Sequence, residues 1–231
     1  MDSIGKLQTY GINAPKQQHF SPYASNGGNT LAISGDDFAI IAADTRLSQG
    51  FSIHSREEPK TLQLTPKVVL GAAGFHGDSL TLKKVIQNRI KLYEHEHGKK
   101  PSVSAIAAML STILYYKRFF PYYVYNLLAG IDDEGKGCVY SYDPVGCYER
   151  EAYRAEGSAA ELLQPLLDNQ IGFKNMENVP KIPLTKQKGL QLVKDAFISA
   201  AERDITTGDS VLIHIIDANG VKTERFPLRR D

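Results

Sequence analysis

The stretch TLAISGDDFAIIAA, residues 30–43, decides the fold of this 231-residue chain. It begins with a short run of mostly apolar residues and continues through Gly35-Asp36-Asp37, which are turn residues. Residues 38–43 are then apolar at every position. A strand that is apolar on both faces must be covered on both sides. The stretch therefore predicts an antiparallel hairpin whose second strand lies between two layers of the molecule.

Outward from this hairpin, the pattern predicts further strands and four helices. Runs of apolar, β-branched and aromatic residues between turns predict strands over residues 61–64, 68–73, 122–131, 137–142, 147–155, 210–217 and 221–226. Apolar residues three and four apart predict helices over residues 78–93, 102–114, 159–168 and 185–203. We expect Asp78 or Ser79 to cap the first helix and Ser102 the second, and Pro165 to kink or end the third.

The order of these elements indicates the fold class. The elements follow one another in blocks: strands, two helices, strands, helices and a closing hairpin. This order favours antiparallel sheets, because a doubly wound parallel sheet needs strict alternation of strands and helices. We expect an α+β fold, a four-layer α-β-β-α sandwich with two sheets inside and helices outside. Residues 1–28 are polar and without helix or strand period, and they predict a leader or propeptide-like arm. Residues 29–231 are expected to form a single domain.

Composition excludes several classes of protein. With 42% hydrophobic and 23% charged residues, the chain is neither disordered nor collagen-like. The 27 Lys+Arg balance 26 Asp+Glu, which argues against binding to nucleic acid or to a membrane surface. Cys138 and Cys147 are expected to be reduced thiols of an intracellular protein. No stretch approaches the roughly 18 apolar residues of a membrane span, and the six His show no metal-ligand spacing. We expect no metal and no cofactor.

Several polar motifs resemble sites, although each one alone favours an ordinary structural role. Asp44-Thr45-Arg46 follows a buried strand, where a turn Asp and a partnered Arg are common. An isolated lysine such as Lys60 is usually on the surface. Residues 204–209, DITTGD, are ordinary turn residues. Gly71-Ala72-Ala73-Gly74 lacks the Gly-Lys-Ser/Thr ending of a phosphate-binding loop.

Taken together, the motifs resemble the β-type subunits of the 20S proteasome, a family with the N-terminal-nucleophile hydrolase fold. The motifs are GGNTLA at 27–32, IIAADTR at 40–46, GAAG at 71–74 and DITTGD at 204–209. The similarity runs from about Ser21 to Asp231. Residues 118–124, 142–146 and 166–170 are similar to one non-catalytic type of β subunit, which occupies the sixth position of the eukaryotic β ring.

This resemblance implies a set of site positions. In active members an N-terminal Thr attacks the peptide carbonyl, and its own α-amine acts as the general base. The resemblance places the assisting Lys at Lys60, the Asp that orients it at Asp44, and the oxyanion Gly at Gly74. The nucleophile falls on Gly28. The matched positions that support the nucleophile and its amine are Ser158, Asp204 and Thr207.

At Gly28 this sequence differs from the active members, which have the nucleophilic Thr at the matched position. This difference decides the expected function, because glycine has no hydroxyl group. Thr30 is two strand residues further on, which displaces its side chain by roughly 6–7 Å, whereas attack needs reacting atoms within roughly 3–3.5 Å. In active members the chain is cut after a Gly so that the following Thr becomes the first residue, whereas Thr30 follows Asn29. We therefore expect no catalytic residue in this chain. The matched residues are expected to be a structural remnant, since removing one partner of a buried pair leaves the other charge alone.

The function that the resemblance implies is that of a non-catalytic structural subunit of the 20S core particle. It would support β-ring assembly in ATP- and ubiquitin-dependent protein degradation, in the cytoplasm and nucleus. Its partners would be neighbouring β subunits, α-ring subunits and β subunits of the opposite ring in an α7β7β7α7 particle, with no nucleic acid and no membrane. Two alternatives stay open: an active threonine-type peptidase with an atypical processing site, and an α/β binding module unconnected with proteolysis.

An aromatic cluster follows the second predicted helix. Aromatic residues are enriched at the cores of protein interfaces, but alternate members of the cluster would equally fill the core of the domain. Its members are Tyr115, Tyr116, Phe119, Phe120, Tyr122, Tyr123 and Tyr125.

Overall fold

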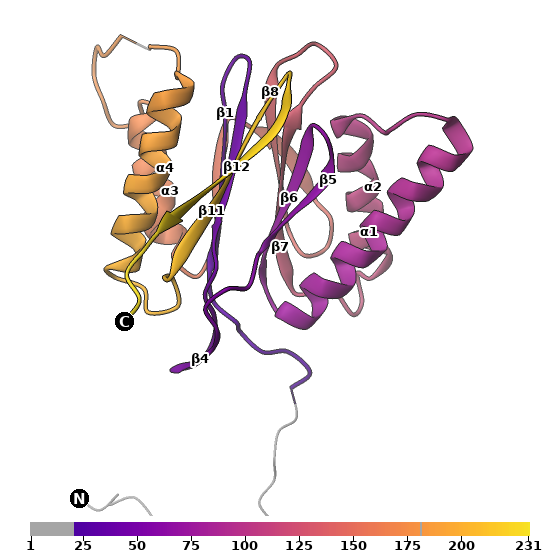
Figure 1. Cartoon of the computed structure of the whole chain (residues 1–231), viewed down its shortest axis with the longest axis horizontal. Helices are drawn as coiled ribbons and strands as arrows, with labels where there is room; N and C mark the ends of the chain where they lie inside the picture. Colours follow the sequence, from indigo (N-terminus) through magenta and orange to yellow (C-terminus); the bar gives the residue numbers. More distant parts are fainter. Residues whose placement is uncertain (1–20, 181) are drawn as a thin grey trace, which may run out of the picture.

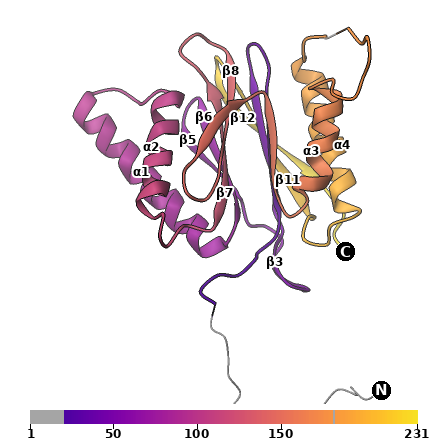
Figure 2. The same ribbon diagram turned by 180° about the vertical axis from the view of Figure 1, so that it is seen from behind.

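The computed structural model describes residues 21–180 and 182–231, which are arranged in four layers (Figure 1). Two five-stranded antiparallel sheets stack face to face, and a pair of helices covers the outer face of each sheet. Figure 2 shows the same layers from behind. The chain therefore has the mixed α/β content and the order of layers that the blocks of elements predict.

The predicted opening hairpin lies within the first sheet. Its two strands pair antiparallel with Leu31 opposite Ala42, and nearly all of their residues are buried. The closing hairpin predicted near the C-terminus completes one side of this sheet. In spatial order the strands are β10 (Tyr153–Gly157), β1 (Asn29–Ser34), β2 (Ala39–Asp44), β11 (Ser210–Asp217) and β12 (Gly220–Pro227).

The second sheet is a meander, because each strand pairs with the next one along the chain. Its strands are β5 (Thr61–Thr65), β6 (Val68–Gly74), β7 (Val124–Ile131), β8 (Gly137–Tyr142) and β9 (Tyr148–Glu151). A short hairpin that the sequence pattern does not predict follows β2. It consists of β3 (Leu47–Gln49) and β4 (Ser52–Ser55), and in Figure 1 it extends from one end of the sheets.

The single strand predicted over residues 147–155 is wrong, because the chain changes sheets within it. β9 pairs with β8 at the exposed edge of the second sheet, whereas β10 pairs with β1 in the first. The change occurs at Ala152, whose carbonyl oxygen accepts hydrogen bonds from Ser34 N at 2.7 Å and Ser34 Oγ at 2.9 Å. Both halves of the run have a strand pattern, so only the stacking of the two sheets reveals the crossover.

Four helices form the outer layers. The second sheet is covered by α1 (His76–His97) and α2 (Val103–Tyr116), and the first by α3 (Ala160–Gln170) and α4 (Lys186–Ala201). The predicted cap of α2 is confirmed, since Ser102 Oγ accepts a hydrogen bond from Ala105 N at 3.2 Å. None of the helices in the described part of the chain is long and apolar enough to cross a membrane.

The predicted start of α1 is wrong. α1 begins earlier than expected and its N-cap residue is Phe75, so Asp78 and Ser79 are not caps. Asp78 lies in the first turn, where a negative charge is stabilising, and its Oδ2 accepts a hydrogen bond from Tyr123 N at 2.9 Å. Pro165 does not end α3. It lies on the exposed face of that helix, where the carbonyl that loses its amide partner is near solvent.

Three apolar clusters hold the four layers together. One lies between the first sheet and α3 and α4, the second between the second sheet and α1 and α2, and the third between the sheets. β2 is apolar on both faces, as its sequence predicts, and it contributes Ile40 to the first cluster and Ile41 to the third. Complete burial of one such side chain stabilises the fold by about 1.5–3 kcal/mol.

His214 forms a polar link between the two sheets. Its Nε2 lies 2.7 Å from Oγ1 of Thr61 in β5, and its Nδ1 lies 2.9 Å from Oγ1 of Thr223 in β12. Burial lowers the pKa of His214 below its ordinary value of 6.5. The neutral ring is therefore the form that the folded chain favours.

We expect the free energy of unfolding to fall as the pH falls from about 7 to about 5.5, because the unfolded chain then binds a proton at residue 214 more readily than the folded chain. In the His214→Gln variant this fall should be smaller. Urea unfolding at the two pH values measures it, and His54→Gln, which changes an exposed histidine, is the control. An identical pH dependence in wild type and His214→Gln would contradict the prediction.

Candidate functional site

A buried ion pair joins the end of β2 to the start of β5. Lys60 Nζ lies 3.2 Å from Asp44 Oδ1 and donates hydrogen bonds to the carbonyl oxygens of Asp44 at 2.9 Å and Arg46 at 2.7 Å. The two side chains are 8% and 0% exposed. Burial raises the pKa of Asp44, although the Lys60 ammonium opposes the rise. Lys60 is thus a buried cation with three oxygen partners, and the surface position expected for an isolated lysine is wrong.

Gly28 lies directly against this ion pair. Its φ of +82° is in the left-handed region that favours glycine. A Cβ atom at Gly28 would lie 2.5 Å from Lys60 Nζ and 3.0 Å from Asp44 Oδ1. The Lys60 side chain therefore fills the space that a side chain of residue 28 would need.

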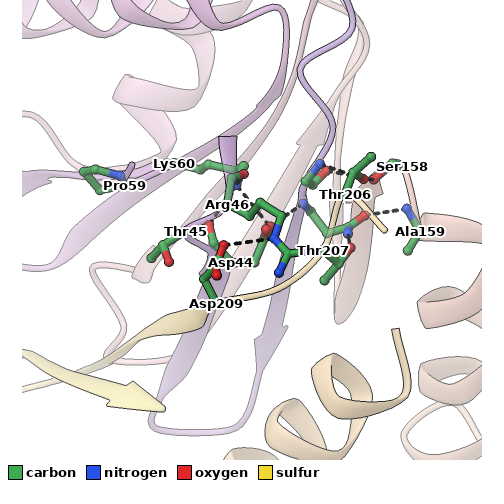
Figure 3. A network of polar contacts seen from close by, with 12 residues as sticks. Asp44, Thr45, Arg46, Pro59, Lys60, Ser158, Ala159, Thr206, Thr207 and Asp209 are labelled. Carbon is green, nitrogen blue, oxygen red and sulfur yellow. Dashed lines mark hydrogen bonds and ion pairs between the residues drawn. The ribbon is translucent and has the colours of Figure 1, made fainter. Parts of the chain in front are cut away.

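On the other side of Gly28, Asp204 organises a cluster of hydroxyl groups. Figure 3 shows the residues that carry them, Ser158, Thr206 and Thr207. Asp204 Oδ2 accepts hydrogen bonds from Ser158 Oγ at 2.7 Å and Thr207 Oγ1 at 2.6 Å. Thr206 donates to the same carboxylate, and its Oγ1 also accepts from Gly28 N at 3.3 Å. Burial alone would raise the pKa of Asp204, but these hydrogen bonds hold it below its ordinary value. Asp204 is therefore an ionised acceptor at neutral pH.

Asn29 connects the ion pair to the hydroxyl cluster, a role that the sequence did not reveal. Its backbone N–H donates to Asp44 Oδ1 at 2.7 Å, and its side-chain amide hydrogen-bonds to Thr207 Oγ1. Its Oδ1 accepts from Ala159 N at 2.6 Å. Asn29 is completely buried. The available signal was a strongly polar residue at the start of an otherwise apolar strand.

The prediction of a partnered Arg at position 46 is confirmed. Its guanidinium pairs with the buried Asp209 at 2.9 Å and donates to the carbonyl oxygens of Ile205 at 2.8 Å and Asp231 at 3.2 Å. A side chain at Gly208 would collide with this guanidinium. Arg46 therefore fixes the loop that contains Asp204 and ties the C-terminus to the end of β2.

The last matched position is Gly74, and Thr30 carries the hydroxyl that was considered as a substitute nucleophile. Gly74 ends β6, and a Cβ atom there would be 2.5 Å from the carbonyl oxygen of Tyr123, so the close strand contact requires glycine. Gly74 and Lys60 line one small recess. The Thr30 side chain lies against Gly71 of β6. Within residues 21–180 and 182–231, no group hydrogen-bonds to Thr30 Oγ1.

The arrangement has the elements that support a nucleophile but lacks a nucleophilic atom at its centre. An ammonium, two carboxylates and several hydroxyl groups surround Gly28, and Gly28 itself contributes only backbone atoms. All seven matched positions lie around the same point or at its rim. In the part of the chain that the structure describes, no group of three or more His, Cys, Asp or Glu side chains could hold a metal ion.

Lys60→Met should destabilise the chain by about 3–5 kcal/mol, because it leaves the Asp44 carboxylate buried without its cation. The double variant Lys60→Met/Asp44→Leu should lose less unfolding free energy than Lys60→Met, since no charge is then left unpaired. Urea unfolding measures both values, with Lys84→Met on the exposed surface of α1 as the control. A double variant as unstable as the sum of the two single variants would contradict this account.

Gly28→Ala should be more destabilising than Gly50→Ala by about 1–3 kcal/mol. Both glycines have positive φ, so both replacements carry the backbone strain. Only at residue 28 does the new methyl group also meet Lys60, because nothing lies within 4 Å of a Cβ atom at residue 50. Equal losses of unfolding free energy in the two variants would show that Lys60 does not fill this space.

Comparisons with known proteins bear directly on this site. The sequence model of the family described as "Proteasome subunit" matches residues 24–216. The chain is 60% identical to "Proteasome subunit beta type-1" of Danio rerio over 227 residues, which are 98% of this chain and 96% of that one. It is 56% identical to the protein of the same name in Drosophila melanogaster over the full length of both chains. It is 45% identical to "Proteasome subunit beta type-6" of Saccharomyces cerevisiae, with 95% of each chain covered. With its fold, its site and these relatives, the chain belongs to the proteasome subunit family.

Proposed function

We propose that this chain is a non-catalytic structural subunit of the 20S proteasome core particle, with the N-terminal-nucleophile hydrolase fold. One observation carries the proposal: Gly28 lies at the centre of the site, against Lys60, Asp44 and the hydroxyl cluster. Acyl transfer needs an oxygen or sulfur nucleophile next to a base. Glycine supplies neither.

The other hydroxyl groups near the site do not replace the missing one. Ser158, Thr206 and Thr207 direct their hydroxyl groups to Asp204, where they hold an ionised carboxylate. Thr30 lies against Gly71 and makes no hydrogen bond to a basic group among the described residues. The Lys60 ammonium is fully occupied by three oxygens. These contacts argue against the alternative of an active threonine-type peptidase.

The surviving polar residues have a structural role in this proposal. Lys60 and Asp44 stabilise each other in a place where neither charge would be tolerated alone. Asn29 and Asp204 use their hydrogen-bonding groups to join β1, β10 and the loop before β11. The site of an active family member would thus be preserved here as the polar centre of a scaffold.

The exposed aromatic residues support a role in assembly. Tyr116 is 87% exposed and Phe119 is 94% exposed, so they do not fill the core of this domain. Large exposed apolar side chains that lie together mark surfaces for protein contact. We propose that the chain occupies the sixth position of a β ring and contacts neighbouring β subunits, an α ring and the opposite β ring. We further propose that it acts in ubiquitin-dependent degradation in the cytoplasm and nucleus.

The proposal predicts that an electrophilic peptide probe forms no adduct with this chain. The assembled particle is treated with the probe, and the intact mass of every subunit is measured. We expect the mass of this chain to be unchanged while active β subunits of the same particle gain the mass of the probe. These subunits are the internal control for probe reactivity.

An adduct on this chain, at Thr30 or elsewhere, would overturn the non-catalytic assignment. The chain should also elute with the other subunits in size-exclusion chromatography of a cell extract. Elution as a monomer would overturn the assignment to the particle.

A further inference from the structure

Lys83 of α1 lies at the rim of the small recess that Gly74 and Lys60 line. Its side chain is half-buried, and its Nζ donates a hydrogen bond to the carbonyl oxygen of Pro59 at 3.1 Å. Pro59 directly precedes Lys60, and Figure 3 shows it on the side of Lys60 that faces away from the hydroxyl cluster. Two lysine side chains therefore meet at one recess.

The walls of this recess leave little water around the Lys83 amine. They are mostly small or apolar and include Leu47 and Ala72. Residues 26 and 27 also line the recess, as part of the described residues 21–28 of the predicted leader, whose residues 1–20 lie outside the described residues. An amine that loses part of its hydration is less stable in its charged form.

Lys83 also lacks the carboxylate partner that would stabilise its charge. Lys186 is half-buried as well, but its Nζ pairs with Asp217 Oδ2 at 2.7 Å. Among residues 21–180 and 182–231, no carboxylate forms such a pair with Lys83; Glu58 lies nearby but pairs with His76, at 3.9 Å. The Glu58 carboxylate thus reaches Lys83 only through its charge.

These surroundings make Lys83 an activated amine. Burial lowers the pKa of Lys83 from its ordinary value of 10.5 to about 8; the Glu58 carboxylate opposes this fall and the Lys60 ammonium adds to it. At pH 7.5 about a quarter of such an amine is neutral, against roughly one in a thousand for an ordinary lysine. The neutral amine is the nucleophilic form, and desolvation next to another cation is a known way to activate a lysine.

We propose that Lys83 is an acylation site of this chain, whose substrates are activated acyl groups such as acyl thioesters. The lone pair of the neutral Nζ attacks the carbonyl carbon of the thioester, so that a C–N bond forms and the C–S bond breaks. The thiolate leaves with the electron pair of that bond and takes up the proton that the nitrogen loses. The inference goes beyond the proposed function and does not rest on it, because the reaction does not involve Gly28.

Acylation of Lys83 changes the charge next to the buried ion pair. The product is a neutral amide, so the ammonium that shares the recess with Lys60 is removed. Lys60 keeps its three oxygen partners and no longer meets a like charge there. We therefore expect the reaction to proceed in the folded chain without unfolding it.

Competitive acetylation of the full-length protein in its native assembly tests this site. A short pulse of N-acetoxysuccinimide labels the native protein, and deuterated acetic anhydride labels the remaining amines after unfolding. Cleavage at arginine places Lys60, Lys83 and Lys84 in one peptide, residues 57–89, whose fragment masses give the native label at each lysine. At about pH 7.5 we expect Lys83 to react about tenfold faster than the exposed Lys84, and the buried Lys60 not to react.

Two further measurements distinguish an activated amine from one that is merely accessible. The rate at Lys83 should level off above pH about 8, whereas the rate at Lys84 should still rise at about pH 9. Glu58→Gln removes the carboxylate that favours the charged amine, so Lys83 should react about twofold faster at about pH 7.5. Glu57→Gln is the matched control, because the exposed Glu57 pairs with Arg225.

Three results would overturn the assignment: a rate at Lys83 no higher than that at Lys84, a rate at Lys83 that does not level off, or equal rates at Lys83 in wild type and Glu58→Gln. The first two come from the wild-type protein, so a variant that fails to fold leaves the test decisive. None of these results concerns the missing nucleophile, which the peptide probe tests separately.

Discussion

The buried ammonium of Lys60 is the constraint on which the site and the junction of the two sheets depend. Its partner Asp44 is the last residue of β2 in the first sheet, and its partner Arg46 follows shortly after. Lys60 itself directly precedes β5 of the second sheet. The Lys60 carbonyl also accepts a hydrogen bond from Ala72 N in β6 at 3.0 Å. A buried charge must keep its partners, because an unpaired one is strongly unfavourable. The ion pair therefore fixes how the ends of the two sheets meet.

Around this pair, a polar framework surrounds Gly28, which has no side chain. The hydroxyl groups of Ser158, Thr206 and Thr207 still converge on Asp204, and Asn29 still joins them to Asp44. Asp204 and Thr206 are half-buried, Thr207 and Asn29 are buried, and Ser158 is exposed. Because these groups hydrogen-bond to one another, removal of a buried one would leave its partners unsatisfied. This mutual dependence gives the polar residues around Gly28 a structural role.

The segment before β1 is held against the body of the molecule beside the site. Asn26 hydrogen-bonds to β3 and to the start of α1, and Tyr23 packs on aromatic residues that follow α2, so the segment connects the site to the aromatic surface. That surface is exposed in the single chain and offers large apolar side chains to neighbours.

The sequence alone determined the features that depend on local pattern: the opening and closing hairpins, the Ser102 cap, the four helices and the order of layers. The resemblance also placed six positions that the fold brings around Gly28 or to the rim of its site. Tertiary structure alone decided that Asn29 joins the site, that the partner of Arg46 is Asp209, and that residues 147–155 cross between sheets at Ala152. The reason is physical. Periodicity records which face of an element is apolar. The burial of a charge and the pairing of a strand depend on residues more than a hundred positions away in the chain. Asp209 is such a partner for Arg46, and Ser34 for Ala152.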